Sequence, residues 1–136
     1  MPITVSITTH APLAKVWQAY TTPADIVQWN AASEDWHTTR AEVDLRPGGR
    51  FCSRMEAKDG SFGFDFEGSY TEVIAHSLIG YAFGDRIAQV RFGEADGQTS
   101  VTVTFDPEDS HSLEQQQEGW QAILNSFKKH VEQVKT

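Results

Sequence analysis

Strictly alternating hydrophobic and polar residues open the chain. Positions 3, 5 and 7 are isoleucine or valine, whereas positions 4, 6 and 8 are threonine or serine. This period of two predicts a strand with one buried face. Two short helices should follow, because Pro12 and Pro23 each suit a first helical turn and precede apolar residues at helical spacing. Residues 30–38 have no clear period and are predicted to form a loop.

From about residue 39 to residue 105 the pattern is that of consecutive strands separated by turns. Pro47-Gly48-Gly49 marks one turn, and Asp59-Gly60 and Asp96-Gly97 are strong hairpin signals. If each Asp-Gly pair supplies the two turn residues, the register follows directly and places the aromatic residues on one face. The predicted pairs are Met55 with Phe64, Ser53 with Phe66, Phe51 with Gly68, Arg54 with Asp65, Phe92 with Val101, Val90 with Val103 and Ala88 with Phe105.

The segment from Ser112 to Val134 has the period of a long amphipathic helix. Its apolar stripe comprises Leu113, Trp120, Ile123, Leu124, Phe127, Val131 and Val134. A sheet with one apolar face and a helix with one apolar stripe bury these surfaces against each other. We therefore expect an α+β fold of order β-α-α-β6-α, in which a curved seven-stranded antiparallel sheet wraps around the last helix and the short helices close one end.

Composition narrows the classes of function. The chain has 136 residues, a formal net charge of −8 and one cysteine, Cys52. This length predicts a single domain over residues 1–136. The negative charge argues against nucleic-acid binding, and no apolar run is long enough to insert into a membrane. The lone cysteine and the absence of a secretion signal indicate a reducing, cytoplasmic location.

Several motifs together resemble one protein family. They are Thr22-Pro23 with Trp29, the run Asp44–Phe51, Asp59-Gly60, the run Gly68–Val73 and Gly119-Trp120. The chain resembles the activator of heat-shock-protein-90 ATPase homologue family, of the START-like or Bet v 1-like helix-grip superfamily (SRPBCC), over residues 3–134. The resemblance implies a helix-grip fold with an elongated cavity between sheet and last helix. Superfamily members hold lipids, polyketides and other apolar molecules there, some are cyclases or dehydratases, and the namesake stimulates a chaperone.

Aromatic residues on the concave face are the main candidates for ligand binding, because one helix can hardly close-pack them all. Each of them could instead simply fill the core. Ser53 could anchor a ligand or merely make room for Phe66, and Gln116 could bind a ligand or lie in solvent. The candidate ligand-binding residues are Trp29, Trp36, Phe51, Ser53, Phe64, Phe66, Tyr70, Phe83, Gln116 and Trp120.

Residues for catalysis or metal binding form no recognisable constellation. Glu34, Asp35 and His37 flank Trp36 in the predicted loop, and the other histidines are scattered without metal-ligand spacing. Cys52, like Asp65 and Glu67, is expected on the outer face of the sheet. We expect neither a metal nor a cofactor.

Three hypotheses for function follow. The first is an intracellular binding protein that holds a hydrophobic small molecule without catalysis. The second is an enzyme of the cyclase or hydrolase kind, which would use His37, Asp35 or Tyr70 around the bound substrate. The third, carried by the resemblance alone, is a partner of a chaperone. The pattern leaves open whether the protein is a monomer or a homodimer.

Overall fold

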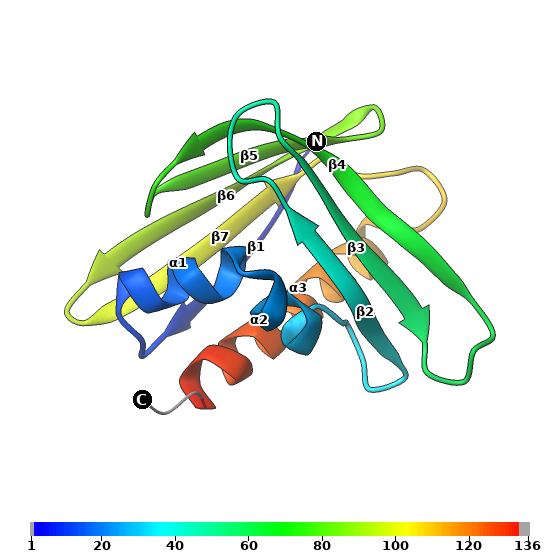
Figure 1. The fold of residues 1–136 in the computed structure, drawn as a ribbon, viewed down its shortest axis with the longest axis horizontal. Helices are drawn as coiled ribbons and strands as arrows, with labels where there is room; N and C mark the ends of the chain where they lie inside the picture. Colours follow the sequence, from blue (N-terminus) through cyan, green and yellow to red (C-terminus); the bar gives the residue numbers. More distant parts are fainter. Residues whose placement is uncertain (1, 134–136) are drawn as a thin grey trace.

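An antiparallel sheet curls around a long C-terminal helix in the computed structural model, which describes residues 2–133 (Figure 1). The order of elements confirms the predicted β-α-α-β6-α helix-grip fold. Val134, which was predicted to end the last helix, lies outside the described residues. The elements are β1 (Ile3–Thr9), α1 (Leu13–Thr21), α2 (Pro23–Trp29), β2 (Trp36–Val43), β3 (Arg50–Ala57), β4 (Gly63–Ile74), β5 (Leu78–Phe83), β6 (Arg86–Ala95), β7 (Gln98–Phe105) and α3 (Leu113–Gln133).

The sheet is a meander with one strand added at its far edge. Within the described residues its seven strands follow the order β1-β7-β6-β5-β4-β3-β2. Each strand from β2 to β7 pairs with its neighbour in sequence, as short connections dictate. Strand β1 instead pairs with β7 along its whole length. The helix α3 packs against β1 and α2 packs against β2, so the helices bridge the two edges of the curled sheet (Figure 1).

Both predicted hairpin registers are confirmed. In the second hairpin Asp96 and Gly97 have φ angles of 56° and 78°, as a two-residue turn of this hand requires. The first hairpin turns differently, because only Gly60 in that turn has a positive φ. There the amide of Ala57 donates to the carbonyl of Phe62 at 2.9 Å, which closes a four-residue loop over residues 58–61. The loop has the same centre as the predicted turn, so the register is unchanged.

The prediction of a loop through residue 38 is wrong for residues 36–38, which begin β2. A β-bulge between Thr38 and Arg40 explains the error. The bulge inserts one extra residue and shifts the inward positions from even to odd numbers. Thr38 is buried before it, whereas Ala41 and Val43 are half-buried after it. A strand interrupted in this way shows no continuous alternation in its sequence.

The short helices are fixed to each other and to α3 by side-chain hydrogen bonds. The indole Nε1 of Trp29 donates to the carbonyl of Ala19 at 3.0 Å, which joins α2 to α1. Nε2 of His130 lies 2.9 Å from Oδ1 of Asp25, which joins α3 to α2. Phe127 on α3, which is fully buried, packs its ring against Trp29 with the ring centres 5.0 Å apart. One end of the half-barrel is thereby closed.

Candidate ligand-binding cavity

A cavity of about 410 Å³ lies between the concave face of the sheet, the helix α2 and the helix α3. Its volume is within the range of roughly 300–1,000 Å³ that is usual for small-molecule sites. The cavity is lined by Tyr20, Thr21, Ile26, Trp29, Asn30, Ala32, Trp36, Glu42, Val43, Phe51, Ser53, Met55, Phe64, Phe66, Tyr70, Ile79, Tyr81, Val103, Gly119, Trp120, Ile123 and Leu124.

The lining is predominantly aromatic and aliphatic. Apart from the tyrosine hydroxyls and the indole N–H groups of the tryptophans, its polar side chains are Thr21, Asn30, Ser53 and Glu42. Glu42 is exposed and lies 3.6 Å from Nε of Arg40, so its charge is balanced at the surface. Among the described residues that line the cavity there is no lysine, arginine or histidine. The site is therefore suited to apolar rather than anionic molecules.

The structure brings most of the predicted ligand-binding residues together. Eight of the ten candidates line the cavity: Trp29, Trp36, Phe51, Ser53, Phe64, Phe66, Tyr70 and Trp120. Ser53 is buried, and its hydroxyl makes no hydrogen bond to any residue within 2–133. Within that range, every side-chain polar atom that is fully shielded from solvent has a hydrogen-bond partner. Because the Ser53 hydroxyl has no partner, it must border open space. A purely structural serine would make a local hydrogen bond. Ser53 makes none among the described residues.

Phe83 lies outside the cavity wall. It is buried, with its ring 5.4 Å from Phe66 and 6.0 Å from Trp120, and the guanidinium carbon of Arg86 lies 4.6 Å from its ring centre. Phe83 shares a face of β5 with Tyr81, but it lies nearer the end of the strand, behind Trp120. It supports lining residues and does not face the cavity itself.

Gln116 is neither exposed to solvent nor directed into the cavity, which corrects both interpretations made from the sequence. Its Oε1 accepts a hydrogen bond from the amide of Glu108 at 2.8 Å. Its Nε2 donates to the carbonyls of Glu108 and His111 at 3.0 and 2.9 Å. The side chain thus fastens the loop before α3 to the first turn of that helix. Its hydrogen-bonding capacity is used within the chain, so Gln116 is not part of the proposed site.

Two features of the sheet and of α3 keep the cavity open. A Cβ atom on Gly68 would collide with the carbonyl of Ala82 and approach the Phe51 ring to 3.0 Å, so only glycine leaves room for that ring beside β4. On α3, Trp120 stacks on Phe105 with ring centres 3.9 Å apart. The stacked indole lines the cavity and also a smaller depression on its far side, so it acts as a wall and does not fill the space.

Sequence reasoning missed two tyrosines of the lining. Tyr20 comes from α1, the first of the two short helices. Tyr81 lies on β5, directly opposite Tyr70 on β4. The alternation that selected Phe83 on the same strand could also have selected Tyr81. No signal in the sequence would have brought Tyr20 into the same cavity, because it depends on how α1 crosses the sheet.

The three residues named for the enzyme hypothesis are not brought together. Tyr70 lines the cavity, whereas Asp35 and His37 do not. Burial, with a smaller contribution from Asp44, raises the pKa of Tyr70 from 10 to about 12. Tyr70 is therefore a phenol at neutral pH, which can donate a hydrogen bond but is a poor base.

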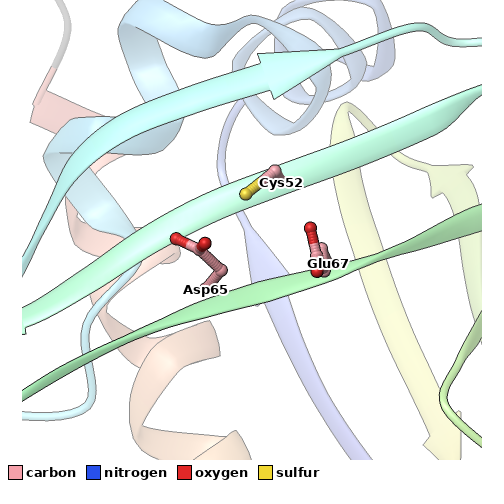
Figure 2. Close-up of side chains that lie close together, drawn as sticks. All are labelled: Cys52, Asp65 and Glu67. Atoms are coloured by element: carbon pink, nitrogen blue, oxygen red, sulfur yellow. The ribbon is translucent and has the colours of Figure 1, made fainter.

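On the convex face, Cys52 on β3 and Asp65 and Glu67 on β4 lie close together (Figure 2). Their potential ligand atoms lie within 4.8 Å of one another. Each carboxylate has an arginine neighbour, at 3.5 Å for Asp65 with Arg54 and at 3.9 Å for Glu67 with Arg50. Partial burial and the charge of Asp65 raise the pKa of the Cys52 thiol. Metal ions bind the thiolate, so this group is explained as part of the surface charge network.

A family model described as "Activator of Hsp90 ATPase homolog 1-like protein" matches residues 10–132. The chain belongs to this family. No curated protein matches the chain. The family's fold is consistent with a small ligand-binding or co-chaperone-like domain. No helix within residues 2–133 is long and apolar enough to cross a membrane.

Solved structures are similar to this chain over most of its length. An AHSA1-like protein from Aeromonas hydrophila, solved by solution NMR, is 48% identical, with a TM-score of 0.87 over 96% of this chain and 92% of that one. A protein from Cytophaga hutchinsonii is 46% identical, with a TM-score of 0.83 over 96% and 91% of the two chains. A protein from Chromobacterium violaceum shares the fold at 23% identity, with a TM-score of 0.87 over 98% and 99%.

Proposed function

We propose that this family member is a carrier that binds an apolar small molecule in the cavity between the sheet and α3. The cavity itself, about 410 Å³ with an aromatic lining, is the observation that carries the proposal. Water in contact with such a wall is released when an apolar molecule replaces it, and this release drives binding. The few polar groups would orient the ligand, as is usual in small-molecule sites.

The proposal is for binding without chemical conversion. Among the described residues that line the cavity, no side chain that could act as a nucleophile lies within hydrogen-bond reach of a base. The serine hydroxyl of Ser53 and the phenol of Tyr70 are both uncharged at neutral pH. They are suited to holding a polar end of the ligand in place.

Gly119 supplies a direct test. It lies in the interior of α3 beside Trp120 and lines the cavity. Apart from its chain neighbours and the backbone of its own helix, no atom lies within 4 Å of the place where its Cβ would be. A glycine in a helix interior costs about 1 kcal/mol relative to alanine, and no packing contact explains it here. The structure supports one explanation for a glycine at this position: a side chain there would obstruct the cavity.

The experiment compares Gly119→Leu with the matched control Gln117→Leu, two positions earlier on an exposed part of the same helix. Binding of the neutral fluorescent probe N-phenyl-1-naphthylamine is measured by titration, with thermal denaturation as a check on folding. We expect the wild type and Gln117→Leu to bind the probe and Gly119→Leu to lose at least about tenfold in affinity. Absence of binding by the wild type, or equal binding by all three proteins, would refute the carrier proposal.

A second candidate function is action on a chaperone, and the family's own description favours it. The test is the ATPase rate of purified Hsp90 with and without a saturating concentration of this protein. A clear stimulation that survives the Gly119→Leu change would support this function and separate it from the cavity. An unchanged ATPase rate would refute it.

A further inference from the structure

All three tyrosines of the chain line the same cavity. They come from three separate elements: Tyr20 from α1, Tyr70 from β4 and Tyr81 from β5. Tyr70 and Tyr81 are directly opposite each other in the sheet. The Phe51 ring lies 5.2 Å from Tyr70 and 5.1 Å from Tyr81, which holds both rings at one place on the concave face.

The hydroxyl groups of these tyrosines have no partner within the described chain. None of the three makes a hydrogen bond to another residue in the range 2–133. In the same range, no buried side-chain polar atom is both sealed from water and without a partner. Each hydroxyl oxygen therefore keeps some contact with open space. All three residues line the cavity, which is the open space that they share. Three hydrogen-bond donors are thus presented to whatever occupies the cavity.

Packing holds the rings in place. Tyr70 and Tyr81 are buried, and Tyr20 has its ring 5.1 Å from Trp29 and 5.1 Å from Phe127. Burial raises the pKa of each phenol, and the charge of a neighbouring tyrosine adds to this for Tyr20 and Tyr81. At neutral pH all three phenols therefore keep their protons and can donate hydrogen bonds.

The charge of the lining decides which acceptor these donors suit. Glu42 is the one charged side chain among the described lining residues, and it is an anion. A carboxylate ligand would leave water without a counter-charge, at a large desolvation cost. An uncharged carbonyl oxygen gains hydrogen bonds without that cost. Resting on the proposed carrier function, we infer that Tyr20, Tyr70 and Tyr81 form a subsite that binds the carbonyl oxygen of an uncharged, largely apolar ligand.

Three probes with one skeleton test this inference: benzophenone, which has the carbonyl, diphenylmethane, which lacks it, and diphenylacetate, which carries a charge. Their affinities are measured by calorimetry for the wild type and for Tyr20→Phe, Tyr70→Phe and Tyr81→Phe. The carbonyl stretching frequency of bound benzophenone is recorded in parallel, because a hydrogen bond lowers it. Replacing tyrosine by phenylalanine keeps the ring and removes only an unpartnered hydroxyl, so the variants should fold.

We expect the wild type to prefer benzophenone to both other probes. Each change to phenylalanine should weaken benzophenone binding about two- to tenfold and leave diphenylmethane binding unchanged. The carbonyl frequency should also rise toward its value in an apolar solvent. Equal binding of benzophenone and diphenylmethane, tightest binding of diphenylacetate, or an unshifted frequency in the wild type would overturn the inference while leaving the carrier function intact. If none of the probes binds and N-phenyl-1-naphthylamine also fails, the carrier function itself is refuted.

Discussion

Alkaline pH should unfold this protein through the tyrosines of its cavity. Burial, and then the charge of Asp44, raises the pKa of Tyr70 from its ordinary value of 10 to about 12. The folded state therefore favours the protonated phenol. The corresponding contribution to the free energy of unfolding is fully present below about pH 10, the pKa in the unfolded chain, and is lost as the pH rises through about 12.

The size of the effect follows from the difference between the two pKa values. A difference of about two pH units corresponds to about 3 kcal/mol for Tyr70 alone. The shifts of Tyr20 and Tyr81 have the same sign, because burial is their main cause, although Arg86 partly offsets the shift of Tyr81. The total stability of a domain is typically about 5–15 kcal/mol. Loss of these contributions should therefore unfold the protein cooperatively within this pH range.

The assay combines urea denaturation at several pH values with the ultraviolet absorbance of tyrosinate. Between about pH 10 and pH 12 the free energy of unfolding should fall steeply, and tyrosinate should form together with the loss of circular dichroism. Tyr70→Phe provides the control, since its free energy of unfolding should fall by about 3 kcal/mol less over the same range. If all three phenols titrate near pH 10 while the circular dichroism stays native, the reasoning about their burial is refuted.

Two further substitutions test how the cavity is built. Gly68→Ala should lower the free energy of unfolding by about 1–3 kcal/mol, because the new Cβ meets the carbonyl of Ala82 and the ring of Phe51. An unchanged urea midpoint would contradict this. Gln116→Leu should lower it by about 1–3 kcal/mol, because the amide of Glu108 loses its acceptor, and should leave binding of the naphthylamine probe unchanged. Weaker probe binding with unaltered stability would instead indicate that Gln116 contacts the ligand.

Much of the sheet was predictable because its signals are local. The hairpin pairs around Asp59-Gly60 and Asp96-Gly97 were all confirmed. Their register depends only on where the turn is centred and on which residues are apolar. The first turn is four residues wide and not two, but its centre is the same. An error in turn geometry therefore left the pairing intact.

The start of β2 was not predictable in the same way. The bulge between Thr38 and Arg40 changes which residues point inward, so Trp36 and Val43 lie on the same face despite the difference in parity of their positions. Because the inward-facing positions change parity within eight residues, the sequence shows no regular alternation there. Gln116 was misread for a related reason, because a helical wheel shows its direction but not the loop that folds back over it.

The order of elements, the strand pairing and the aromatic character of the concave face follow from local signals, because period, turn residues and helix signals act over a few positions. The amount of space that remains between the sheet and the helix is set by the tertiary fold and cannot be derived from local signals. That volume depends on the curvature of the whole sheet and on the path of α3 across it. The same long-range geometry decided that Tyr20, Tyr70 and Tyr81, which are far apart in sequence, line one cavity while Phe83 lies behind its wall.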